Sequence, residues 1–103
     1  MLYHKNWTHH TAIMNVESLV LWLRQQDPNK RYLYGNAKAC LLTQYLEDHG
    51  YDGYAMPTYY KVDGLKYHLP KELNSIAEYP KSWFKLRTFG GALKEAEKYL
   101  VAK

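Results

Sequence analysis

The stretch Thr58–Leu69, T-Y-Y-K-V-D-G-L-K-Y-H-L, decides the fold of this 103-residue chain. Two β-prone runs flank Asp63 and Gly64, and an Asp-Gly pair is typical of a type I′ turn because both central positions need positive φ. Such a turn fixes the register of a β-hairpin, since the residues on either side of it must face each other. We therefore expect strands over 58–62 and 65–69.

The predicted register gives the hairpin two faces of different character. Side chains alternate along a strand, so every second residue lies on the same face. The face that we expect against the core carries Thr58, Tyr60, Val62, Leu65, Tyr67 and Leu69. On the opposite face, Lys61 lies across from Lys66, and Tyr59 lies across from His68. Like charges opposite each other destabilise a sheet, so this basic face is either a solvated surface that discourages edge pairing or a binding site.

The remaining sequence predicts four helices and one more strand. Apolar residues recur at helical spacing, and glycine or proline follows several of the expected ends. The expected helices cover 16–26, Ala37–His49, about two turns from Pro70 to Ala77, and 89–100, with N-caps at Asn15, Asn36 and Thr88. The β-prone segment Arg31–Tyr34 is expected as an edge strand, whereas 51–57 is expected as a loop.

These elements follow the order α-β-α-ββ-α-α, which predicts an α+β fold. We expect a small single domain in which helices pack on a short antiparallel sheet that contains the β-hairpin. Residues 1–13 lack periodicity and are expected as an N-terminal arm, so the domain itself is expected over 14–103.

The composition argues against several classes of protein. Hydrophobic residues make up 47% and charged residues 23% of the chain, which is ordinary for a globular domain. No apolar run approaches the roughly 20 residues of a membrane helix. Cys40 is the only cysteine, which excludes an internal disulfide and favours a reducing cytoplasm. Eleven tyrosines, three tryptophans and a net charge of +4 favour an aromatic contact surface and an anionic partner.

Residues able to support catalysis or bind a metal ion are sparse. The sequence has no phosphate-binding loop, paired-cysteine motif or nucleophile elbow. Cys40 lies near the predicted start of a helix, a position that can activate a thiol, but no base is evident beside it. We expect a packing residue there, and a thiol enzyme stays the least favoured alternative. His4, His9 and His10 lack the spacing of a metal site, so we expect neither a metal ion nor another cofactor.

A second aromatic and basic stretch, 81–87, extends the basic face of the hairpin in our interpretation. Surfaces of this composition bind phosphates and stacked bases. The candidate binding residues are therefore Tyr59, Lys61, Lys66, His68, Lys81, Trp83, Lys85 and Arg87.

Sequence patterns in three parts of the chain point to a class of proteins. They are V-E-S-L-V-L-W-L-R-Q-Q-D-P at Val16–Pro28, C-L-L-T-Q-Y-L at Cys40–Leu46, and L-P-K-E-L at Leu69–Leu73 followed by T-F-G-G-A-L at Thr88–Leu93. Together they resemble small uncharacterised bacteriophage accessory proteins, at the level of pattern. The resemblance implies a protein that acts by binding, including inhibition of host defence or redirection of a host protein.

The first hypothesis is a non-enzymatic binding protein, a phage-encoded accessory factor that engages a host macromolecule. A host protein is the expected partner. Nucleic-acid or nucleotide binding through the basic aromatic face is the alternative. We expect the protein in the host cytoplasm, without a membrane partner, and a homo-oligomer is left open.

Overall fold

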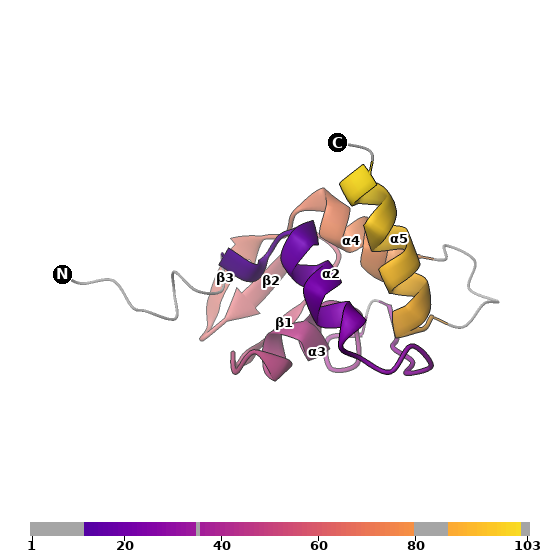
Figure 1. Cartoon of the computed structure of the whole chain (residues 1–103). Helices are drawn as coiled ribbons and strands as arrows, with labels where there is room; N and C mark the ends of the chain where they lie inside the picture. The colour runs from indigo at the N-terminus through magenta and orange to yellow at the C-terminus, as the bar shows by residue number, and fades with distance from the viewer. Residues whose placement is uncertain (1–11, 35, 80–86, 102–103) are drawn as a thin grey trace.

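The computed structural model describes residues 12–34, 36–79 and 87–101. It confirms the α+β class, with helices packed on a three-stranded antiparallel sheet (Figure 1). The elements are α2 Val16–Arg24, α3 Leu41–Asp48, β1 Gly53–Ala55, β2 Tyr59–Val62, β3 Leu65–His68, α4 Lys71–Glu78 and α5 Phe89–Val101. No helix within the described ranges combines the length and the apolar character needed to cross a membrane.

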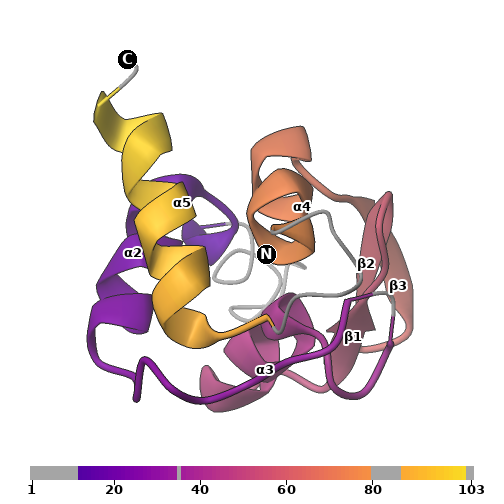
Figure 2. The same cartoon turned by 90° about the vertical axis from the view of Figure 1, so that its right-hand side faces the viewer.

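The helices lie on one side of the sheet. Figure 2 shows the strands along one side of the molecule, with α4 between them and the pair α2 and α5. α2 and α5 lie side by side, although they come from opposite ends of the described chain. The ring of Trp22 packs on those of Tyr45 and Phe89, with centroids 5.1 and 5.3 Å apart. Tyr45 and Phe89 are fully buried, so this aromatic group forms part of the core.

Two of the predicted helix caps are confirmed. The Asn15 side chain accepts a hydrogen bond from the Ser18 N–H at 2.8 Å, at the start of α2. The Thr88 hydroxyl accepts one from the Gly91 N–H at 3.1 Å, in the first turn of α5. Each bond satisfies an N–H group that the helix itself leaves without a partner.

The hairpin and its register are confirmed. Asp63 and Gly64 have φ of 53° and 83°, as a type I′ turn requires. The pairs across β2 and β3 are Tyr59–His68, Tyr60–Tyr67, Lys61–Lys66 and Val62–Leu65, as predicted. The central strand is β2, because β1 pairs along its other side.

The expectation that the whole inner face is core is wrong for two residues. Tyr60 and Val62 are 2% exposed, but Leu65 is 58% exposed and Thr58 is also exposed. Tyr60 and Val62 belong to the central strand, whereas Leu65 lies beside the turn on an edge strand. The inner face therefore buries Tyr60, Val62 and Leu69 and leaves Leu65 and Thr58 open to solvent.

The third strand lies elsewhere than predicted. Arg31–Tyr34 contributes one isolated bridge, from Arg31 to Thr88, and β1 forms instead within the predicted loop 51–57. The buried Tyr32 explains the difference, because its hydroxyl donates to the carbonyl of Tyr79 at 3.1 Å. That contact directs the segment to the C-terminal end of α4 rather than to the sheet.

The second helix begins later than predicted. α3 starts at Leu41, with Cys40 as its N-cap, rather than at Ala37. Asn36 is a capping residue, but its side chain accepts from the N–H groups of Lys38 and Ala39 within a separate turn. A side chain that satisfies a local turn in this way competes with helix formation.

Candidate binding surface on the outer face of the sheet

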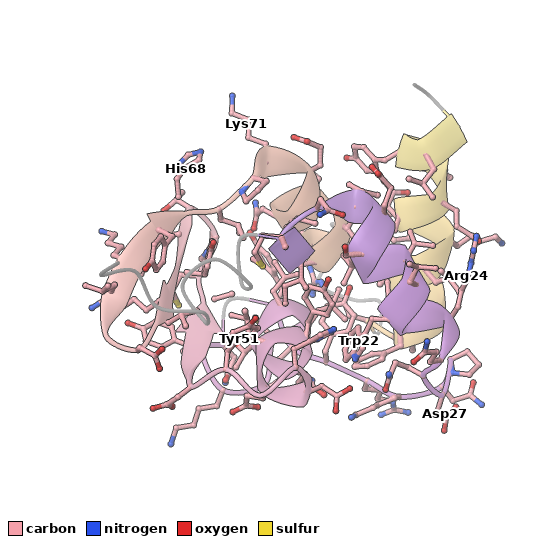
Figure 3. All side chains as sticks on the ribbon, turned by 60° about the vertical axis from the view of Figure 1, so that its left-hand side comes forward. Trp22, Arg24, Asp27, Tyr51, His68 and Lys71 are labelled. Carbon is pink, nitrogen blue, oxygen red and sulfur yellow. The ribbon has the colours of Figure 1, made fainter. Side chains whose placement is uncertain are left out.

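The side of the sheet away from the helices carries an aromatic and basic cluster. We call it the outer face, and it consists of Tyr54, Tyr59, Lys61, Lys66 and His68. The structure thus brings together the four hairpin residues predicted from the sequence and adds Tyr54, which pairs with Lys61 from β1. Figure 3 shows His68 and the nearby Lys71 extending outward from the same end of the molecule.

The two outer-face lysines are held especially close together. Leu69 N–H donates to the Thr58 carbonyl at 3.2 Å, which makes 58 and 69 a hydrogen-bonded pair. Because such pairs alternate along an antiparallel ladder, Lys61 and Lys66 form a non-hydrogen-bonded pair, the type in which side chains approach most closely. Neither lysine forms an ion pair with any residue of the described ranges. No ion pair within that part of the chain therefore offsets their repulsion.

The tyrosines hold one of these lysines in place. The Lys66 ammonium lies 4.3 Å from the centroid of the Tyr59 ring, a cation–π contact. Tyr54 meets Tyr59 edge-on, with centroids 6.4 Å apart and ring planes at 72°. A side-chain hydrogen bond with Tyr54 raises the pKa of Tyr59, so the Tyr59 phenol stays protonated at neutral pH. The cluster is thus neutral in its rings and positive in its lysines.

The charge on this side of the molecule is uneven. Asp52 and Asp63 are exposed at the turn end, where the Asp63 N–H donates to the Asp52 carbonyl at 2.9 Å. His68 and Lys71 lie toward the other end of β3. The carboxylates of Asp52 and Asp63 therefore offset positive charge at the turn end of this side, away from Lys71.

Of the predicted extension of the site, only Arg87 lies within the described residues, and its contacts lie elsewhere. Arg87 donates from Nε to the Glu78 carbonyl at 2.9 Å, and its guanidinium lies 5.4 Å from the Tyr34 ring. These contacts attach Arg87 to the end of α4, not to the outer face. Lys81, Trp83 and Lys85 lie outside the described residues, so their part in the site stays a prediction.

Cys40 has a structural role at the edge of β1. Its thiol is 5% exposed, accepts from the Thr43 N–H at 3.4 Å, and lies 3.6 Å from the Ala55 carbonyl. The Thr43 hydroxyl accepts from the Ala55 N–H at 2.9 Å. Side chains at the start of α3 thus satisfy the outward backbone groups of Ala55 in β1, and the packing interpretation of Cys40 is confirmed. His49, the nearest histidine in sequence, bonds instead to the Tyr45 carbonyl.

Thr43→Val is expected to weaken this contact between helix and sheet. The substitution keeps the shape of the side chain but leaves the buried Ala55 N–H without its acceptor, which costs roughly 1–3 kcal/mol. The measurement is the free energy of unfolding in urea. Thr58→Val, at an exposed position, is the control and should change that value by less than about 0.5 kcal/mol. Equal values for the two variants would contradict the role given to Thr43.

A hollow of about 410 Å³ lies on another part of the surface, lined by residues that include Met14, Leu73 and Tyr99. The carboxylates of Glu17 and Glu72 also line it, so it does not suit an anionic ligand. No group of three or more His, Cys, Asp or Glu side chains suited to a metal ion occurs in ranges 12–34, 36–79 and 87–101. His4, His9 and His10 fall outside these ranges.

Comparison with known proteins finds no family model, no curated protein and no solved structure that matches this chain. The functional argument therefore depends on the chemistry of the outer face.

Proposed function

We propose that this chain is a non-enzymatic binding protein whose outer face contacts an acidic surface of a partner protein. The observation that carries the proposal is the Lys61–Lys66 pair, which places two lysine side chains opposite each other without an ion pair to a carboxylate of the described residues. Such a pair lowers the stability of a sheet. An acidic partner removes this repulsion on binding, so the arrangement favours the complex over the free protein.

The contacts of the Tyr59 ring favour a protein partner over a nucleic acid. Stacking of a base needs an accessible ring face. The Lys66 ammonium occupies one face of Tyr59, and Tyr54 packs edge-on beside it. Nucleic-acid binding stays the second candidate, because lysines next to tyrosines also suit phosphates and bases.

The resemblance to bacteriophage accessory proteins supports a host protein as the partner. Proteins of that class often act by binding and redirecting host factors. In this proposal the chain works in the host cytoplasm, and inhibition of a host defence protein is one form that the activity takes.

A paired charge reversal tests the outer face directly. In the variant Lys61→Glu/Lys66→Glu, capture of the host partner by the immobilised chain is expected to fall at least about tenfold, because the acidic partner is now repelled. The matched control is Lys38→Glu/Lys94→Glu, which makes the same change in net charge at two exposed lysines away from the outer face. Bound protein is quantified by mass spectrometry, and bound nucleic acid is quantified alongside it.

The outcomes separate the two candidates. Equal capture by both double variants would contradict a role for the outer face. Capture that disappears after nuclease treatment would favour the nucleic-acid candidate. In that case binding through the two lysines should fall about tenfold between 50 and 200 mM salt, given a slope of about −0.9 per phosphate contact.

A further inference from the structure

The two edges of the sheet differ in whether other described residues bind their outward backbone groups. At β1, Thr43 and Cys40 bind the outward backbone groups of Ala55. At β3, the alternation of pairs directs the N–H and C=O groups of Lys66 and His68 away from β2. No described residue pairs with these groups, because β3 is the last strand of the sheet.

The open edge is short, but it lacks two of the features that protect such edges. Proteins blunt an edge strand with proline, a bulge or a charged side chain that reaches across it. Residues 65–68 contain no proline, and they pair with β2 without a bulge. The Lys66 ammonium lies over Tyr59 of the neighbouring strand, which directs it back across the sheet rather than over the edge.

The side chains along this edge have a pattern that a partner can match. Lys66 and His68 lie on the outer face, whereas Leu65 and Tyr67 lie on the inner face. Leu65 is 58% exposed despite being apolar. A strand added beside β3 would therefore meet positive charge on one face and apolar surface on the other.

We propose that an extended segment of the partner adds to β3 as a further strand of the sheet. Its alternate residues are acidic beside Lys66 and His68, and apolar beside Leu65 and Tyr67. The backbone groups of Lys66 and His68 supply the pairing, and the two faces supply the specificity, as in other cases of strand addition. The inference rests on the proposed function, since it states how the acidic partner is held.

Charge argues against a second copy of the chain as the occupant. Pairing of β3 with β3 of another copy would bring the Lys66 and His68 side chains of both copies onto one face. No carboxylate lies within residues 65–68 to offset them. An acidic strand would instead place carboxylates beside these side chains, so it is the occupant that the charges favour.

The probe is a synthetic peptide in which glutamate and valine alternate over seven residues. On addition of this peptide to the full chain, the amide protons of Lys66 and His68 are expected to exchange with solvent at least about tenfold more slowly, because they become hydrogen-bonded. The control peptide has the same composition without alternation, E-E-V-V-E-E-V, and should give less than half of this protection. A lysine–valine peptide should give none.

Two substitutions of Lys66 distinguish the contribution of its backbone N–H to peptide binding from that of its charge. Lys66→Gln keeps the outward N–H and loses the charge, so binding should weaken only a few-fold. Lys66→Pro also loses the N–H, and its ring obstructs an incoming strand, so binding should weaken at least about tenfold more. Proline is tolerated at an edge position whose N–H faces solvent, and circular dichroism checks that the variant folds.

The results distinguish failure of this inference from failure of the proposed function. If Lys61→Glu weakens peptide binding but Lys66→Pro and Lys66→Gln bind equally, the outer face binds and the edge does not. Strand addition would also be overturned if the Lys66 and His68 amides of the original chain exchange no more slowly at about 1 mM peptide than without it. If Lys66→Pro does not fold, this exchange measurement is the test of strand addition. If Lys61→Glu also has no effect, the proposed function fails as well.

Discussion

Gly53→Ala is expected to destabilise the protein by at least about 3 kcal/mol, a large fraction of the stability of a small domain. A Cβ at this position would overlap the carbonyl oxygen of Lys61, and it would lie 2.9 Å from the carbonyl carbon of Lys61 and 3.1 Å from the Cα of Val62. All of these atoms belong to the backbone of β2, so no side chain can rotate away. β1 must separate from β2, and the contact between α3 and the sheet is lost with it.

Gly64→Ala is the control for this prediction. Gly64 has φ of 83°, and a Cβ there would meet no atom within 4 Å, so the cost is limited to conformational strain of about 1–2 kcal/mol. The measurement is the urea midpoint followed by tryptophan fluorescence, because Trp22 lies in the core. A urea midpoint for Gly53→Ala as high as that for Gly64→Ala would show that the pairing of β1 with β2 does not require glycine at position 53.

The protein is expected to lose stability steeply above pH 10 because of its buried tyrosines. Burial raises the pKa of Tyr32 and Tyr45 well above the usual value of 10.0, and it raises that of Tyr60 to about 12. These raised values stabilise the fold fully below pH 10, and the contribution of Tyr60 is lost as the pH rises through about 12. Between pH 10 and 11 each of these tyrosines lowers the free energy of unfolding by about 1 kcal/mol. The three together therefore lower it by about 3 kcal/mol.

Tyr60→Phe tests the assignment of this effect to individual residues. The variant removes one ionisable group, so the loss of stability between pH 10 and 11 should shrink by about 1 kcal/mol, roughly one third. The measurement is a series of urea titrations across this pH range, with the original chain alongside. An unchanged pH dependence in Tyr60→Phe would contradict a raised pKa for Tyr60.

The hairpin could be predicted in detail because its signals are local. The Asp63–Gly64 turn fixes the register by its own geometry, and alternation then divides the side chains between two faces. The Lys61–Lys66 pair at the centre of the candidate site follows from these two facts alone. Asn15 and Thr88 were equally predictable, since a cap acts within one turn of helix.

The errors arise where distant parts of the chain decide the structure. Arg31–Tyr34 is β-prone, but Tyr32 is drawn to the end of α4. β1 has only three residues, too few for alternation to be visible, and it depends on Gly53 fitting against β2. Tyr54 was therefore missed as a member of the outer face. Arg87 was assigned to that face by composition, although it belongs to the end of α4.

The pairing of α2 with α5 also affects how the protein can be made. α2 leaves the ribosome early, but the helix that lies beside it is completed only near residue 101. Until then Trp22 lacks the Phe89 ring that packs on it, and the Arg24–Glu97 ion pair cannot form. Folding is therefore delayed until nearly the whole described chain has been synthesised, and nascent chains that end before Phe89 are natural targets for chaperones and proteases.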